Sequence, residues 1–270
     1  MGSLPLRFLR GFALSLGLRH SACVGLLALT GLLASPDPAT ALPWHLGDVL
    51  TYTQVSWVDN ATAAALLTDH YSNVYLSTSD VFEVGIPGPS GFSLSFGDAS
   101  HVVAFLPQAG IAGPLTESQT NPGSSESGLF AGDVIALKLD VDYSDAGLLL
   151  GSSGIPFGDL VLSNFSKDFD GYTIAAVNLN GLSVSEFLGD VNIALGGGGS
   201  NIASISALDD ILENVDIAFD GGIVTPFAQD HLMAPSRAVS AVPEPSSWVL
   251  FGTGLATLAS TMRRRRHRTV

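Results

Sequence analysis

Imidazole can act as a general base or as a metal ligand, and four histidines lie between residues 42 and 242. They are His45, His70, His101 and His231. None stands at metal-ligand spacing from another, and the chain has no His-Glu-x-x-His zinc motif, Gly-x-Ser-x-Gly nucleophile elbow or Walker phosphate loop. Asp69-His70 and Asp230-His231 could contribute to a Ser-His-Asp site, since triad members can be distant in sequence. Because adjacent residues rarely supply both a base and the group that orients it, we interpret both pairs as solvated surface.

Aspartates at short spacing offer oxygen ligands for calcium. Asp140, Asp142 and Asp145 form one such group, and Asp168-Phe169-Asp170-Gly171 forms another. No stretch shows the Asp-x-Asn/Asp-x-Asn/Asp-Gly order of a calcium loop, and the alternative is that these aspartates cap helices and keep the protein soluble. The sequence therefore predicts no cofactor and no firm metal site, with Asp140, Asp142 and Asp145 as the candidate ligands should calcium bind.

A hydrolase acting on polysaccharide would need two carboxyl groups that face each other in a cleft. Asp209, Asp210 and Glu213 are candidates, but nothing in the sequence distinguishes them from surface charge. A deep pocket that holds two facing carboxyl groups with shifted pKa values would favour this alternative.

The charge of the chain is strongly segregated. The formal net charge is −14, yet residues 42–242 hold 23 acidic residues against Lys138, Lys167 and Arg237, a net charge of −20. Nucleic-acid binding requires clustered Lys and Arg, so this region argues against a nucleic-acid partner. The single cysteine, Cys23, lies before this region, which therefore contains no disulfide bond.

The elements that position these residues are predicted to be short in the first half. Residues 49–57 are rich in β-branched and aromatic side chains and predict a strand. Residues 60–70 predict a helix behind an Asn cap, and residues 81–86 and 92–96 flank a turn cluster and predict a hairpin. Residues 109–128 are rich in Gly, Ser, Pro and Thr and predict a flexible surface loop or linker.

The second half carries a repeat of 24 residues. Residues 184–197 (VSEFLGDVNIALGG) and 208–221 (LDDILENVDIAFDG) place apolar residues at steps of 3, 4, 3 and 4, which is typical of an amphipathic helix. Ser183-x-x-Glu186 predicts a capping box and Ser206-x-x-Asp209 resembles one. We expect two antiparallel helices joined by a short Gly-rich turn, which pack together or onto a sheet. Residues 135–143 align with this repeat but also alternate with period two, and we favour helix there.

The N-terminus has the three parts of a secretory signal peptide. Basic residues precede an apolar stretch at residues 22–34, and prolines and the triplet Ala39-Thr40-Ala41 follow it. We expect export through the Sec translocon and cleavage by signal peptidase after Ala41. An uncleaved anchor is the alternative.

At the C-terminus, an apolar segment is followed by a basic block. Residues 248–262 are apolar or small, and Arg263, Arg264, Arg265 and Arg266 follow. As a helix these residues span only about 22 Å, short of the roughly 30 Å of a bilayer core. The arginines should remain cytoplasmic, so the acidic region lies on the far side of the membrane. A buried helix of a soluble fold is the alternative.

Pro243, Glu244 and Pro245, the apolar segment and the arginine block together resemble the PEP-CTERM sorting domain of exported bacterial proteins. The resemblance covers residues 242–268. It implies that an exosortase, a membrane protease or transpeptidase, recognises Pro243-Glu244-Pro245 and processes the chain there. By the same resemblance, these three residues are determinants of recognition and not catalytic groups.

The expected fold class is α+β, with short strands in the first half of the exported region and the repeated helix pair in the second. The expected organisation is a signal peptide at 1–41, an acidic domain at 42–238, a linker at 239–247, a transmembrane helix at 248–262 and a basic cytoplasmic tail at 263–270. We expect a non-enzymatic protein of the cell surface or extracellular matrix, held transiently in the inner membrane before processing. An association with exopolysaccharide and biofilm rests on the resemblance alone. A secreted calcium-dependent carbohydrate-binding module and a secreted hydrolase are the alternatives.

Overall fold

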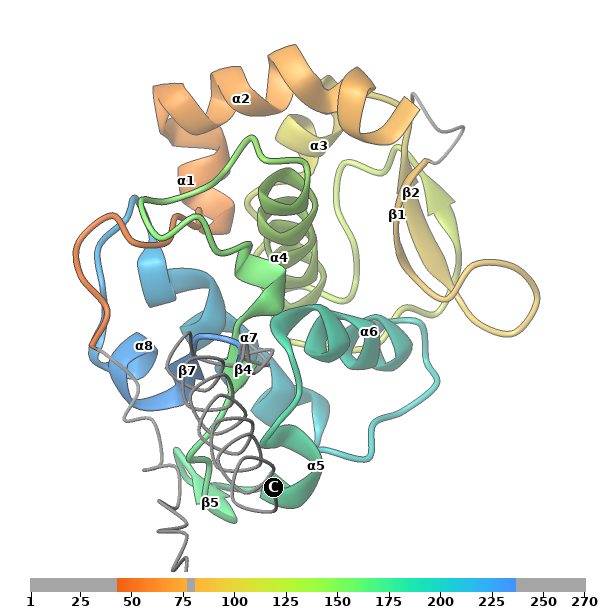
Figure 1. The fold of residues 1–270 in the computed structure, drawn as a ribbon. Helices are drawn as coiled ribbons and strands as arrows, with labels where there is room; N and C mark the ends of the chain where they lie inside the picture. Colours follow the sequence, from red (N-terminus) through yellow and green to blue (C-terminus); the bar gives the residue numbers. More distant parts are fainter. Residues whose placement is uncertain (1–42, 77–80, 237–270) are drawn as a thin grey trace, which may run out of the picture. The chain divides into compact units, whose positions relative to one another are not determined.

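A computed structural model describes residues 43–76 and 81–236 of the chain (Figure 1). The expected signal peptide with Ala39 and Ala41, the linker, the apolar segment 248–262 and the arginine block all lie outside these residues. Among the helices of the two described ranges, none has the length and apolar character needed to cross a membrane.

One helix, α4 (Leu129–Asp145), runs through the core (Figure 1). Thirteen of its 17 residues are buried, and it packs against α1, α6, α7 and β1. A helix that is apolar on nearly all sides is stable only when other elements surround it. The helix that we favoured for residues 135–143 is therefore confirmed, and its period-two alternation has no structural counterpart.

The first half is more helical than predicted. Helices α1 (Gln54–Asp59) and α2 (Ala61–Tyr71) lead into a π-helical turn, η1 (Ser72–Leu76). The helix predicted for residues 60–70 is confirmed as α2, and its cap Asn60 accepts from the backbone N–H groups of Thr62 and Ala63.

The strand predicted for residues 49–57 is wrong. The Thr53 side chain accepts from the backbone N–H of Ser56 and so begins α1 in the middle of that range. Trp57 is fully buried and its ring lies 5.4 Å from that of Tyr143 on α4. Packing of the aromatic residue against α4 thus overrides the β propensity of its neighbours.

The hairpin predicted for residues 81–96 is confirmed. Strands β1 (Phe82–Gly85) and β2 (Ser93–Phe96) pair antiparallel, and β3 (Gln119–Thr120) adds to β2 in parallel. Along the chain, α3 (Ala99–Phe105) lies between β2 and β3. Because β3 and the buried Leu115 belong to the segment 109–128, that segment is part of the domain and not a linker between domains.

The two repeated segments form α6 (Val184–Leu195) and α7 (Ile205–Asp216). The capping box of Ser183 and Glu186 is confirmed. Helix α7 is capped instead by Ser204, two residues before the predicted Ser206.

Both helices bury the predicted apolar face against α4. Helix α6 also packs on β1, as one of the two expected arrangements required, but the expected helix hairpin is replaced by two helices on a central third (Figure 1).

The remaining elements are short. They are η2 (Phe157–Asp159), β4 (Val161–Leu162), β5 (Asp168–Phe169), β6 (Tyr172–Thr173), α5 (Ala176–Leu179), η3 (Ile217–Phe219), α8 (Pro226–His231) and β7 (Leu232–Met233). Strand β4 pairs with β7 and β5 with β6, both antiparallel. The described region is therefore an α+β domain, as expected, in which helices supply most of the core.

Candidate functional site

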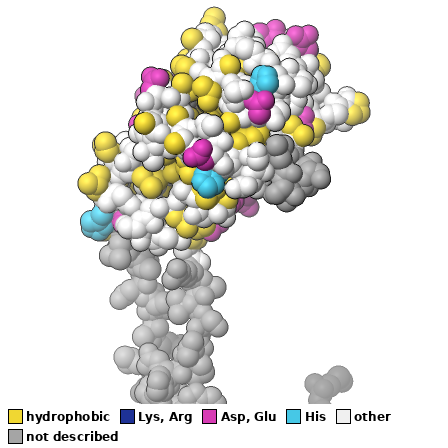
Figure 2. Space-filling model, turned by 90° about the horizontal axis from the view of Figure 1, so that it is seen from above, with side chains coloured by type: hydrophobic (Ala, Val, Ile, Leu, Met, Phe, Trp, Pro, Cys, Tyr) yellow, Lys and Arg dark blue, Asp and Glu magenta, His cyan; other side chains and the backbone are white. Residues whose placement is uncertain are grey.

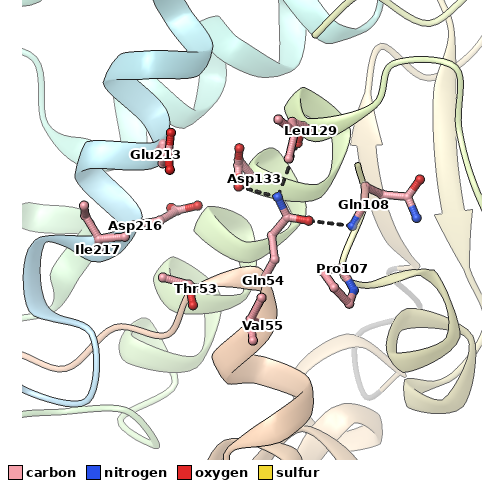
Figure 3. Close-up of a pocket in the computed structure, with 10 residues that line it drawn as sticks. All are labelled: Thr53, Gln54, Val55, Pro107, Gln108, Leu129, Asp133, Glu213, Asp216 and Ile217. Carbon is pink, nitrogen blue, oxygen red and sulfur yellow. Dashed lines mark hydrogen bonds between the residues drawn. The ribbon is translucent and has the colours of Figure 1, made fainter. Parts of the chain in front are cut away.

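A pocket of about 300 Å³ lies where α1, α4, α7 and the loop after α3 meet (Figure 3). Its walls combine aliphatic and polar side chains with three acidic ones. The lining residues are Thr53, Gln54, Val55, Pro107, Gln108, Leu129, Asp133, Glu213, Asp216 and Ile217.

Helix α7 supplies the acidic side of the pocket. Asp209, Glu213 and Asp216 follow one another at steps of four and three and so share a helix face. The side chain of Asp216 extends toward Asp133 on α4, and Glu213 lines the same pocket (Figure 3). The folding of α7 onto α4 thus gathers carboxyl groups at the pocket.

Asp216, the last residue of α7, is the most unusual of these groups. It is only 1% exposed, and neither of its carboxyl oxygens has a hydrogen-bond partner among the described residues. Burial raises its pKa well above 3.8, and the charges of Asp133, Asp140, Glu213 and Asp209 raise it further. Buried polar atoms are nearly always hydrogen-bonded in folded proteins, so two unpartnered oxygens on one buried side chain call for an explanation.

Asp133 is held in place by an amide relay. The Gln54 side chain donates from Nε2 to the Asp133 carboxyl group, and its Oε1 accepts from the backbone N–H of Gln108 at 2.8 Å. Burial raises the pKa of Asp133 to about 7; the Gln54 hydrogen bond opposes the rise, and the charges of Asp209 and Glu213 add to it. Gly132 leaves the room that this relay needs, because a Cβ atom there would lie 1.9 Å from Gln54 Oε1.

No lysine of the described ranges forms an ion pair with an acidic residue of the pocket. Lys138 and Lys167 are the lysines in those ranges, and Lys138 pairs with Asp142 at 2.9 Å. In the part of the molecule that can be described, no three His, Cys, Asp or Glu side chains are placed to hold a metal ion. The face drawn in Figure 2 shows acidic and hydrophobic side chains but no lysine or arginine among the coloured residues. Among the described residues, the pocket is therefore acidic without a counter-ion.

The three calcium candidates all lie on α4 but serve different contacts. Asp140 is fully buried and accepts from the backbone N–H of Tyr52 at 2.9 and 3.2 Å. Asp142 pairs with Lys138, and Asp145 ends the helix. Because successive helix residues are turned by about 100°, Asp140 and Asp142 point in nearly opposite directions. The helix does not bring the three carboxylates together.

Only some of the candidate hydrolase residues lie at the pocket. Glu213 lines the pocket, and Asp209 lies beside it on the same face of α7, with its pKa raised to about 6 by burial and by the charges of Asp210 and Glu213. Asp210 does not line the pocket, and its pKa is raised by burial and by the charge of Asp170. Sequence reasoning missed Asp133 and Asp216, and the available signals were a charge inside the apolar run at 130–137 and the four-three spacing on α7.

The histidines take part in local packing. His45 and His101 lie 3.4 and 2.9 Å from aspartate carboxylates three residues away. His231 Nδ1 lies 3.0 Å from the carbonyl oxygen of Ser163, and its ring packs against phenylalanines. The ring of His231 is half-buried, so the interpretation of Asp230-His231 as solvated surface does not hold for this ring.

Comparison with family models identifies residues 241–266 as a PEP-CTERM protein-sorting motif. The match includes Pro243, Glu244 and Pro245 and the block Arg263–Arg266. Comparison with curated proteins and with solved structures gave no match. The motif implies an exported protein that is sorted by an exosortase to the cell surface or the extracellular space. The chain is thus a PEP-CTERM domain-containing protein, with its sorting motif at residues 241–266.

Proposed function

We propose that this protein acts, without catalysing a reaction, at the cell surface or in the extracellular matrix in association with exopolysaccharide. The observation that carries the proposal is the PEP-CTERM motif at residues 241–266. The composition of the domain supports it, because a strongly acidic exported domain stays soluble and can associate with cations and polar polymers. Before processing, the apolar segment 248–262 would hold the chain transiently in the inner membrane.

Cell fractionation of a Glu244→Ala variant and of a chain truncated after Met262 tests the sorting step. We expect both to stay cell-associated and unprocessed, because each removes one part of the recognised motif. Glu117→Ala is the matched control, since it removes an exposed glutamate from the folded domain. Unchanged surface delivery and C-terminal processing in both variants would contradict the proposed use of the motif.

Deletion of the gene tests the association with exopolysaccharide. We expect the mutant to retain less matrix polysaccharide, and we expect the wild-type gene, but not the Glu244→Ala variant, to restore it. A mutant with an unchanged matrix would contradict this part of the proposal and leave the sorting step standing.

The acidic pocket meets one requirement of the hydrolase alternative, which is a cavity lined by carboxyl groups with raised pKa values. Acid–base catalysis also needs environments that push the two pKa values apart, so that one group gives a proton while the other stays ionised. Burial raises the pKa values of both Asp133 and Asp216. In keeping with the proposal of a non-enzymatic protein, we propose that the pocket binds a ligand without reacting with it.

A further inference from the structure

The buried carboxyl group of Asp216 lacks a hydrogen-bond partner among the described residues. An ionised carboxylate removed from water is costly unless a positive charge or hydrogen-bond donors replace the water. Asp216 is 1% exposed, and the described protein offers its oxygens no donor. The group must therefore hold a proton or meet a cation that comes from outside.

The surroundings of Asp216 favour a cation. Asp133 and Glu213 line the same pocket, and Asp209 lies on the same helix face. Asp216 also ends α7, and the C-terminal end of a helix carries partial negative charge. All of these groups lower the energy of a positive charge in the pocket.

The shape of the pocket distinguishes an organic cation from a metal ion. The described residues contain no group of three ligands placed for a metal, and a volume of about 300 Å³ greatly exceeds that of a bare ion. Three of the pocket residues are exposed aliphatic side chains: Val55 is 51% exposed, Leu129 41% and Ile217 36%. A pocket that combines exposed aliphatic side chains with buried acidic ones fits a positive group on a carbon body.

A primary ammonium group is complementary to the buried carboxyl groups of the pocket. It is a compact charge with three N–H donors, whereas Asp216 offers two free acceptor oxygens and Asp133 is fixed by Gln54. The Gln54 relay orients Asp133 before any ligand arrives, which reduces the entropy lost on binding.

We propose that the pocket between α1, α4 and α7 binds a primary ammonium group of a small organic cation through Asp216 and Asp133. An amino sugar and a lysine side chain of a polypeptide both carry this group on a carbon body of suitable size. The inference stands on the pocket alone and does not require the association with exopolysaccharide.

Isothermal titration calorimetry of the full-length chain at pH 7 tests the proposal with two probes. Glucosamine represents the amino sugar and Nα-acetyl-lysine methylamide the polypeptide. Each has a neutral counterpart in which the same nitrogen carries an acetyl group, N-acetylglucosamine and Nα,Nε-diacetyl-lysine methylamide. We expect at least one ammonium probe to bind and its acetylated counterpart to bind at least about tenfold more weakly, because acetylation removes the charge. The probe that binds identifies the source of the ligand.

Asp216→Asn keeps the shape of the side chain and removes its charge, and we expect it to weaken binding at least about tenfold. Asp133→Asn serves as a second variant should Asp216→Asn fold poorly, and circular dichroism checks the fold of each. Asp210→Asn is the matched control, because it removes a carboxylate from the same helix outside the pocket. Failure of both ammonium probes to bind, equal binding of the acetylated probes, or wild-type affinity in both pocket variants would overturn the proposal.

Discussion

Asp140 and Asp216 are both buried aspartates, at 0% and 1% exposure, yet the structure treats them in opposite ways. Both oxygens of Asp140 lie within hydrogen-bond distance of the backbone N–H of Tyr52, so this carboxyl group fixes the segment before α1 to the central helix. Neither oxygen of Asp216 has a hydrogen-bond partner in the described part of the chain, and its side chain points into the pocket. Burial alone therefore does not mark a functional carboxyl group. The hydrogen-bond partners of a buried carboxyl group mark it instead, because they separate a group that stabilises the fold from one that is left for a ligand.

The largest expected effect is a fall of stability with rising pH. Burial raises the pKa of Asp133 to about 7, and it also raises those of Asp140 and Asp216 well above 3.8. Between pH 3.8 and about 7 the folded chain keeps protons that the unfolded chain has released, so the free energy of unfolding falls as pH rises. The slope is about 1.4 kcal/mol per pH unit for each group that titrates in this way.

Urea unfolding at pH 5 and pH 8 measures this effect. Asp216→Asn should make the dependence shallower, because it removes one of the contributing groups. A free energy of unfolding that rises from pH 5 to pH 8 would contradict the assignment of these carboxyl groups as buried groups with raised pKa values.

Paired alanine substitutions compare the two aspartates directly. Asp140→Ala leaves the buried N–H of Tyr52 without an acceptor and should lower the free energy of unfolding by about 2 kcal/mol. Asp216→Ala loses no hydrogen bond and opens onto an existing pocket, so we expect a change below about 1 kcal/mol. Urea unfolding at pH 5 gives both values, and equal losses would abolish the distinction between the two sites.

A smaller effect is expected from the glycine that makes room for the amide relay. Gly132→Ala places a Cβ atom against Gln54, displaces the donor of Asp133 and should cost about 1 kcal/mol. Gly189→Ala is the matched control, because this exposed position of α6 has open space around it. Alanine there should raise stability by about 0.5–1 kcal/mol through helix propensity. Thermal unfolding of both variants checks the difference, and a Gly132→Ala variant as stable as the wild type would show that the relay is not tightly packed.

Local patterns in the sequence predicted the elements whose stability is local. The steps of three and four predicted α6 and α7, Asn60 predicted the start of α2, and Ser183 with Glu186 predicted a capping box. The first residues of α1 carried a misleading β-rich pattern, and the contact that decided their structure joins Trp57 to Tyr143, far along the chain.

The candidate site could be predicted only in part. Glu213 was identified as an acidic candidate and lines the pocket, whereas Asp133 and Asp216 were not singled out. Their burial depends on the packing of α7 against α4, which spacing along the sequence does not specify. The sorting motif, by contrast, was predicted from sequence, because a short linear motif carries its recognition residues within a few positions.

The most direct test of the difference between Asp140 and Asp216 is a carbon-detected NMR titration of the aspartate carboxyl groups with and without an ammonium probe. An ammonium ion binds the ionised carboxylate more tightly than the protonated acid, so it must lower the pKa of the group that it contacts. We predict that the probe lowers the pKa values of Asp216 and Asp133 and leaves that of Asp140 unchanged. Unchanged pKa values for all three groups, or an equal shift for Asp140, would contradict the account.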